Sequence, residues 1–232
     1  MKAERSLQAL NVVTALLMIA ATALVFLYAP REATMGDVQR IFYFHVPSAW
    51  VAGLAFLVTL LAGIAYLRSG DRKWDMLALA SVEIGVVFTT MNITSGAVWG
   101  CIAWNGCWTW EPRLTTATIT WLVYVAYLML RGGIADPERR ARFAAVYGIV
   151  GFVSVPITYF SIQLARSIHP VLFGPNNPAA KGNAPLTPPM LRTFFFCLFV
   201  FTVLYANLLW NRMRLERFGE RVEQLKAKFL SA

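Results

Sequence analysis

The chain has 232 residues, of which 58% are hydrophobic and only 14% are charged. Soluble domains of this length rarely have so apolar a composition, so these values argue against an ordinary soluble fold. The formal net charge of +9 suggests nucleic acid as a partner. The basic residues are, however, distributed over separate loops, and we therefore expect no nucleic-acid partner.

Six apolar runs are long enough to cross a bilayer core, which takes about 20 residues per helix. Because no alternation typical of a β-barrel is present, we predict a single all-α integral membrane unit with six transmembrane helices. The first apolar run, of about 22 residues, is longer than the apolar region of a signal peptide, and we expect a retained anchor. The predicted spans are 8–29, 47–67, 76–98, 116–130, 143–164 and 190–210.

The distribution of Lys and Arg between the loops predicts the orientation. The side that holds both termini carries 15 of the 21 basic residues, and the other side carries 6. The positive-inside rule then predicts that both termini are cytoplasmic, where anionic lipid head groups of the bilayer meet the basic excess. We divide the chain into a six-helix membrane domain, 1–210, and a basic cytoplasmic tail, 211–232. The tail has the spacing of a helical extension, and a partner site on it stays open.

The loop after the third span is rich in tryptophan and is predicted to be external. Its sequence is WGCIAWNGCWTWEPRLT, and it holds four of the eight Trp residues of the chain, Trp99, Trp104, Trp108 and Trp110. Tryptophan is enriched at membrane interfaces, which is one interpretation. The other is an aromatic platform for a flat apolar ligand, because Gly100 and Gly106 permit tight chain reversals and close approach of a ligand.

His45 and His169 are the only histidines, and both are predicted to lie on the external side. We expect Pro47 to hold Val46 extended and to begin a helix, while Pro170 restricts His169. Two neutral imidazoles can bind one metal ion from two sides, whereas a four-ligand zinc site would also need both external cysteines. An aromatic platform between two imidazoles suits a planar iron macrocycle, since His is a common haem ligand.

Further polar residues near these positions leave alternatives open. Arg113 can pair with a haem propionate, and Glu111 either pairs with Arg113 at the membrane interface or orients an indole N–H. Cys101 and Cys107, six residues apart, fit a disulfide, two free thiols, or a zinc or redox role. Glu83, inside the third span, is either a structural residue or lines a path, because ionisable groups there need a partner or a wet cavity.

Together these segments resemble the tryptophan-rich WWD signature of the haem-handling proteins of cytochrome c biogenesis. The segments RIFYFHVPSAW and VPITYFSIQLARSIHP resemble those that carry the two external histidines of that family, and the similarity covers about residues 10–210. Six spans in a chain of this length fit the haem exporter protein C (CcmC) branch. Two residues depart from the signature: Glu111 replaces an Asp, and Cys107 replaces a common Trp.

The resemblance implies that the chain is a haem carrier rather than an enzyme. It implies ferric haem b, bound transiently with His45 and His169 as axial iron ligands, on the periplasmic face of the bacterial cytoplasmic (inner) membrane. It further implies transfer to the haem chaperone CcmE, in a complex with CcmA, CcmB and CcmD. ATP use would belong to CcmA, because this chain has no phosphate-binding loop. The implied platform comprises Trp99, Trp104, Trp108, Trp110, Glu111 and Arg113.

Two other functional classes are weaker. A bis-His haem oxidoreductase linked to quinone is the main alternative, but both histidines are predicted on one face, where a single haem cannot carry electrons across the bilayer. A small-solute transporter that uses Glu83 has no other support in the predicted spans.

Overall fold

The computed structural model describes residues 2–165, 167–171 and 186–230. Within these ranges the protein is helical, and six stretches are long and apolar enough to cross a membrane. This confirms the prediction of an all-α membrane protein with six spans. The helices are α1 (Lys2–Ala23), α2 (Phe42–Ser69), α3 (Arg72–Ala103), α4 (Pro112–Gly133), α5 (Pro137–Gly151), α6 (Ser154–Leu164) and α7 (Pro188–Leu230). A π-helical turn (Leu24–Tyr28) extends α1, and a 3-10 turn (Asp37–Ile41) precedes α2.

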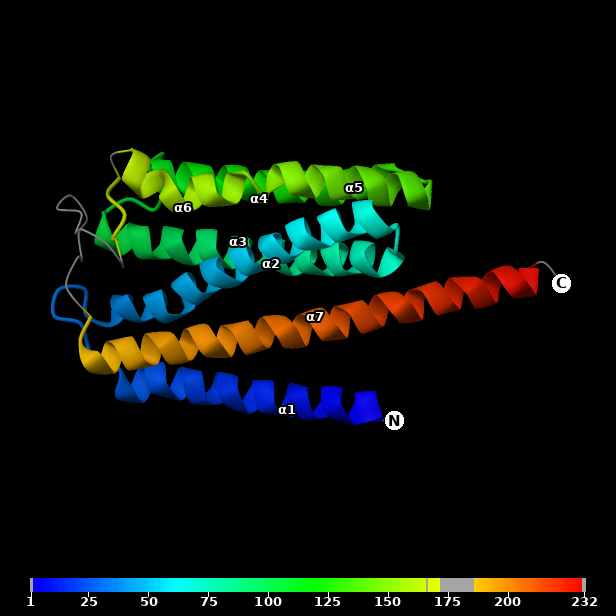
Figure 1. Cartoon of the computed structure of the whole chain (residues 1–232). Helices are drawn as coiled ribbons and strands as arrows, with labels where there is room; N and C mark the ends of the chain where they lie inside the picture. Colours follow the sequence, from blue (N-terminus) through cyan, green and yellow to red (C-terminus); the bar gives the residue numbers. More distant parts are fainter. Residues whose placement is uncertain (1, 166, 172–185, 231–232) are drawn as a thin grey trace.

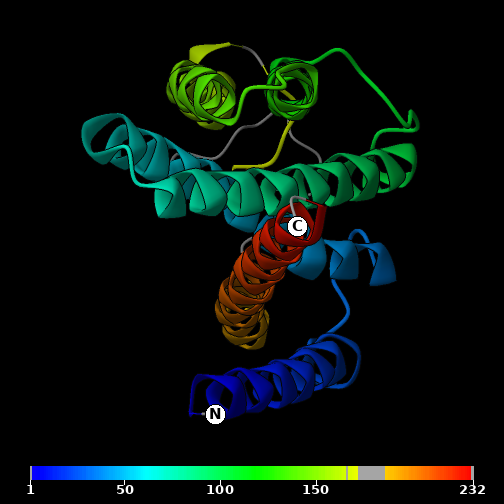
Figure 2. The ribbon, with the colours of Figure 1, turned by 90° about the vertical axis from the view of Figure 1, so that its right-hand side faces the viewer.

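The helices form layers around a central pair, α2 and α3. Helix α4 and the pair α5–α6 lie on one side of the central pair, and α7 and α1 lie on the other (Figure 2). Both termini lie at one end of the bundle, which we call the termini end (Figure 1). The opposite, loop end carries residues 29–41, 104–111, 165 and 167–171. The structure thus separates the tryptophan-rich loop from the termini; which end faces the cytoplasm stays a prediction.

Close packing and buried hydroxyl groups hold the central layer together. The Phe56 ring of α2 stacks on Tyr124 of α4 with 3.6 Å between the ring centroids. A Cβ atom added at Gly85 would lie 2.5 Å from the Phe56 ring, so only glycine lets α3 approach α2 this closely. The Ser81 hydroxyl donates to the Ala55 carbonyl at 2.8 Å and lies 2.6 Å from the Tyr205 hydroxyl. Small residues and such hydrogen bonds join helices in membranes, where apolar transfer contributes little.

The predicted fifth span, 143–164, is two helices rather than one, because α5 ends at Gly151 and α6 begins at Ser154. The cause is Pro156, which lacks the N–H that would donate to the Phe152 carbonyl and whose ring clashes with it. The Val155 N–H donates to that carbonyl instead, at 3.0 Å. The pair still counts as one membrane span in length and hydropathy.

Helix α2 begins earlier than predicted and contains Pro47 within it, so the expectation that Val46 is extended is wrong. The added first turn is stabilised by aromatic packing. Tyr43 is fully buried, and the Phe42 ring lies 5.1 Å from the Phe194 ring of α7. His45 therefore lies on a helix rather than on an extended segment.

Helix α7 is continuous across the predicted boundary at residue 210 and runs to Leu230. It is held to α3 by Arg212, whose Nη2 atom donates to Glu83 at 2.9 Å. Arg212 also pairs with Glu216 at 2.7 Å. Glu83 thus has a charged partner on a neighbouring helix, which favours the structural interpretation of this residue over a path through the membrane.

One buried ion pair links α3 to α4 at the termini end, and it yields a stability prediction. Asp75 and Arg131 form a bidentate pair, with 3.0 Å between Nη2 and Oδ2, and their side chains are only 7% and 9% exposed. Asp75→Ala leaves the buried guanidinium without its partner. We expect this substitution to lower the free energy of unfolding by about 3–5 kcal/mol, measured by thermal unfolding in detergent.

The matched control is Glu138→Ala, which removes an exposed pair with Arg142 at 3.9 Å and should change stability by less than about 0.5 kcal/mol. The double variant Asp75→Ala/Arg131→Met removes both charges and should recover part of the loss. An Asp75→Ala protein as stable as the parent would contradict this account.

Candidate functional site

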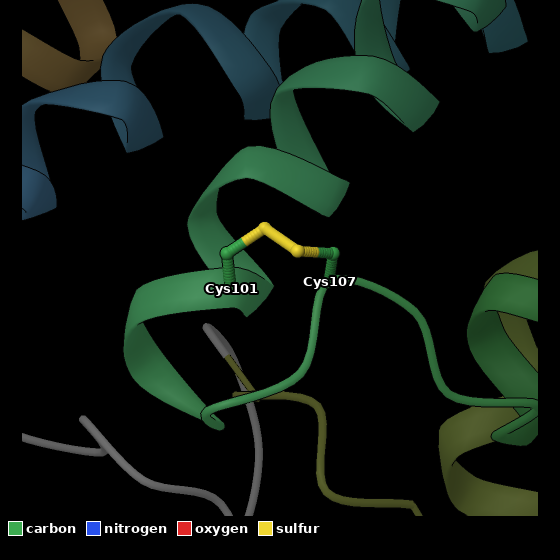
Figure 3. Close-up of a disulfide and its surroundings, with 2 residues drawn as sticks. All are labelled: Cys101 and Cys107. Carbon is green, nitrogen blue, oxygen red and sulfur yellow. A yellow bond between two sulfur atoms is a disulfide. The ribbon is translucent and has the colours of Figure 1, made fainter.

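The tryptophan-rich loop is tied to the end of α3 by a covalent bond. Cys101 and Cys107 form a disulfide with 3.8 Å between their Cα atoms (Figure 3). The chain reverses at Asn105, which has a φ of 56°. Asparagine tolerates this left-handed conformation better than most residues. Of the open alternatives for the two cysteines, the structure contains the disulfide, so these sulfur atoms cannot complete a zinc site.

The two loop glycines differ in their roles. A Cβ atom added at Gly100 would lie 3.2 Å from the Trp104 ring and 3.3 Å from the Gly106 carbonyl oxygen, so Gly100 lets the loop fold closely onto the end of α3. A Cβ atom at Gly106 would meet open space. The left-handed residue at the chain reversal is Asn105 rather than either of the glycines that we expected to permit it.

The four loop tryptophans form two separate pairs. The Trp99 and Trp104 rings meet edge to face with 5.0 Å between centroids, and Trp104 lies 6.1 Å from the His169 ring. Trp108 and Trp110 form a second edge-to-face pair at 5.5 Å, in which Trp110 is 76% exposed. The first pair thus reaches a histidine, and the second pair presents an indole at the surface.

The structure brings His45 and His169 together, although they are 124 positions apart in the chain. Their ring centroids are 6.4 Å apart. Two imidazole nitrogens that each lie about 2 Å from one metal ion, on opposite sides of it, put the ring centroids about 6 Å apart. The spacing therefore fits one metal ion between the two rings. Within the described ranges, no group of three or more His, Cys, Asp or Glu residues gathers in a way that could hold a metal ion.

His45 is held by one face of α3 that the sequence analysis missed. The Ser95 hydroxyl donates to the Met91 carbonyl at 2.6 Å, so its oxygen accepts from His45 Nδ1, 3.0 Å away. In this tautomer Nε2 carries the imidazole lone pair, which either the Asn92 amide or a metal ion can take. The Asn92 amide nitrogen donates to the His45 carbonyl at 3.1 Å and lies 3.3 Å from both ring nitrogens.

Gly96 completes this contact, because a Cβ atom there would lie 2.9 Å from His45 Cε1. The signal in the sequence is the helical spacing of Asn92, Ser95 and Gly96 inside an apolar run. Positions three and four residues apart share a helix face, and polar residues within a membrane helix seek a partner.

His169 is held by the loop that contains it and by the start of α4. The Ser167 oxygen accepts from the His169 backbone N–H at 3.1 Å, and the Ser167 hydroxyl donates to Glu111. The other Glu111 oxygen lies 4.0 Å from His169 Nδ1 and accepts from the Leu114 N–H at 2.9 Å, which caps α4. Ser167 is a further residue that the sequence analysis did not identify.

The environment of His169 favours its neutral form. Burial is the main cause that lowers the pKa of His169 to about 3, and the charges of Arg113 and His45 act in the same direction. An imidazole with this pKa is neutral near pH 7, which is the form that binds metals.

Arg113 joins α4 to α6 rather than pairing with Glu111. Its Nη1 atom donates to the carbonyls of Thr158 and Tyr159 at 3.0 and 2.9 Å, and the guanidinium lies 5.9 Å from the Tyr159 ring centroid. Because a guanidinium has five N–H donors, these two bonds leave capacity for an anionic group. The suggested contact between Arg113 and a propionate stays a prediction.

The family model and the curated relatives that match this chain give the same family. The family model of CcmC, heme exporter protein C, matches residues 1–228. Heme exporter protein C of Bradyrhizobium diazoefficiens is 31% identical over 85% of this chain and 74% of its own length. The protein of that name from Haemophilus influenzae is 29% identical over 88% of this chain and 81% of its own length. A cytochrome c biosynthesis ccmC-like mitochondrial protein of Marchantia polymorpha is 27% identical over 61% of this chain and 59% of its own length.

The disulfide predicts the number of reactive thiols. Cys197 is the remaining cysteine and is buried in α7. Protein isolated from membranes without reductant, then denatured and treated with a maleimide reagent, should gain one adduct by mass spectrometry. Prior reduction should raise this to three, and Cys197→Ala should lower each count by one. Three adducts without reduction would show that Cys101 and Cys107 are thiols in the isolated protein.

Proposed function

The chain belongs to the heme exporter protein C family, and on this premise we propose that it carries haem at the loop end, with the iron between His45 and His169. Family membership gives it a role in haem handling for cytochrome c maturation, as a membrane-embedded transport component. The observation that carries the proposal is the 6.4 Å separation of the two imidazole rings beside Trp104.

The residues at the loop end suit a haem cargo. With two neutral imidazoles as the protein ligands, the macrocycle supplies the other donors to the iron. Trp99 and Trp104 offer aromatic edges to the porphyrin, and each good aromatic contact contributes about 0.5–1.5 kcal/mol beyond burial. The remaining donors of Arg113 suit a propionate. We assign ferric haem b as the transient cargo.

The loop end is proposed to face the periplasm, and the termini end the cytoplasm, of a bacterial inner membrane. Two independent features support this orientation. The Lys and Arg residues are concentrated in the termini and in the loops beside them, as the positive-inside rule expects for the cytoplasmic side. The disulfide lies at the opposite end, and disulfides persist in oxidising compartments such as the periplasm.

We further propose that the haem passes to the chaperone CcmE, with CcmA, CcmB and CcmD as the other members of the export complex. The exposed Trp110 side chain offers a docking contact at the loop end, since exposed aromatic residues often anchor protein interfaces. This is a carrier role, in which the site binds and releases one molecule without changing it. A quinone-linked oxidoreductase suits the arrangement less well, because both histidines lie at one end of the bundle.

The ligand assignment predicts the absorption spectrum of haem-replete membranes. The parent protein should show six-coordinate haem, and His45→Ala and His169→Ala should each convert it to five-coordinate haem or lose it. Thr94→Ala, an exposed substitution on the helix beside His45, serves as the control. Unchanged spectra in both histidine variants would remove these residues as ligands. Haem that stays bound, shows a stable and reversible redox couple and is never transferred to the chaperone would favour the oxidoreductase.

Asn92 yields a prediction about positioning. Asn92→Ala removes the amide that holds the His45 backbone and contacts its ring. Residues that orient metal ligands typically change affinity by about 10–100-fold when lost, and we expect haem affinity to fall within that range. The near-infrared and electron paramagnetic signals of the low-spin iron should shift as well. Thr94→Ala should change neither quantity, and an Asn92→Ala protein with parental affinity and spectra would contradict the positioning role.

A further inference from the structure

The last four turns of α7 carry an exposed apolar stripe with the spacing of a coiled-coil seam. Its members recur at intervals of three and four residues, and each side chain is between 47% and 81% exposed. A repeat of this kind keeps one apolar line along a helix, which a second helix normally covers. The seam residues are Leu215, Phe218, Val222, Leu225 and Phe229.

The seam continues a face of α7 that is already used for packing inside the bundle. Counting back in the same register gives Asn211 and Leu208 and then Leu204 and Phe201, the last two of which belong to the hydrophobic core. Figure 1 shows α7 extending past the other helices at the termini end. This face of α7, interrupted by Asn211, therefore continues beyond the end of its neighbours within the protein.

The opposite face of this segment is fixed to the bundle. Glu220 pairs with Arg72 of α3 at 2.9 Å. Glu216 pairs with Arg212 of the same helix at 2.7 Å, and Arg212 in turn donates to Glu83 of α3. Glu216 and Glu220 lie on the side of the helix away from the seam, so these contacts leave the seam side chains exposed.

Charge on the two flanks of the seam identifies the kind of occupant. In a heptad repeat, the positions that flank the apolar line face the flanking positions of the partner helix. Here they hold Arg214, Arg221 and Lys228 on one side and Gly219 and Lys226 on the other. Arg214 also pairs with Glu4 of α1 at 2.9 Å, and Lys226 pairs with Glu223 of its own helix at 2.7 Å, so the flanks already bind carboxylates. A second copy of this chain would set these basic residues against one another in either direction of pairing. A helix with acidic flanks would meet them with opposite charge.

A bilayer surface fits the geometry less well. An interfacial helix lies in the plane of the membrane with its apolar face in the lipid. This segment is instead one continuous helix with the membrane span that precedes it, and it projects from the bundle in the same direction (Figure 1). The seam thus leads away from the bilayer.

From these observations we infer that the end of α7 is a docking site for an amphipathic helix of another protein, whose apolar seam is flanked by Glu or Asp. The surface lies at the opposite end of the molecule from the histidines and acts independently of haem.

The test uses the full-length protein in nanodiscs of neutral lipid and a labelled synthetic peptide of three heptads. In each heptad the peptide carries Leu at the two seam positions and Glu at the two flanking positions. We expect saturable binding by fluorescence anisotropy, and at least tenfold weaker binding of the same peptide with Lys at the flanking positions. The charge reversal Arg221→Glu/Lys226→Glu should invert this preference.

Matched variants separate the seam from the rest of the helix. Leu225→Ala should weaken binding of the acidic peptide at least tenfold, whereas Gln224→Ala, next to it on the outer face, should leave it unchanged. All variants should keep the thermal stability of the parent, because these side chains are exposed.

Three outcomes would overturn the inference. Equal binding of the acidic and basic peptides would show that charge does not select the occupant. Loss of peptide binding in nanodiscs of anionic lipid would identify the membrane as the occupant. A dimer that forms without peptide and is lost in Leu225→Ala would identify a second copy of the chain.

Discussion

The candidate site depends on the carboxylate of Glu111. One of its oxygens caps the first turn of α4 through the Leu114 N–H, and the other accepts from the Ser167 hydroxyl. Ser167 in turn accepts from the His169 backbone N–H. The tryptophan-rich loop ends at this same residue, so one side chain fixes the position of His169 relative to both α4 and the loop. Charge-assisted hydrogen bonds suit this task, because they are shorter and stronger than those between neutral groups.

Much of the fold could be predicted from the sequence because the bilayer imposes a simple rule. Every backbone polar group in the lipid must be paired within the protein, so six long apolar runs mean six helices. Hydropathy does not report where the backbone hydrogen bonds inside an apolar run are interrupted. The fifth span was therefore predicted without its break. Pro156 was visible in the sequence and is the physical cause of that break. The start of α2 was misplaced for a related reason, since the burial of Tyr43 against α7 outweighs the local preference at Pro47.

The site was only partly predictable. The residue types indicated which side chains could bind a metal ion or an aromatic ligand. The charge of the loops indicated that these side chains lie at the same end of the bundle. The distance between the two imidazoles could not be predicted in this way, because it depends on how closely α2 approaches α3 at Gly96. The disulfide was likewise left open, since a spacing of six residues permits it without requiring it. The turn at Asn105 brings the two cysteines together, and a left-handed residue in a loop leaves no periodic signal.

The two departures from the tryptophan-rich signature have a common explanation in this geometry. A glutamate at position 111 has one more carbon than the aspartate expected from the resemblance, and its two oxygens reach the start of α4 and Ser167 separately. A cysteine at position 107 replaces the packing of an indole by a covalent bond to α3. Both changes hold the loop through specific bonds rather than through aromatic contact. The aromatic contact with His169 then comes from Trp104, backed by Trp99, which both lie before the disulfide-bonded Cys107 in the chain. In this chain the loop is fixed by polar and covalent bonds, which leaves Trp104 beside His169 and Trp110 at the surface.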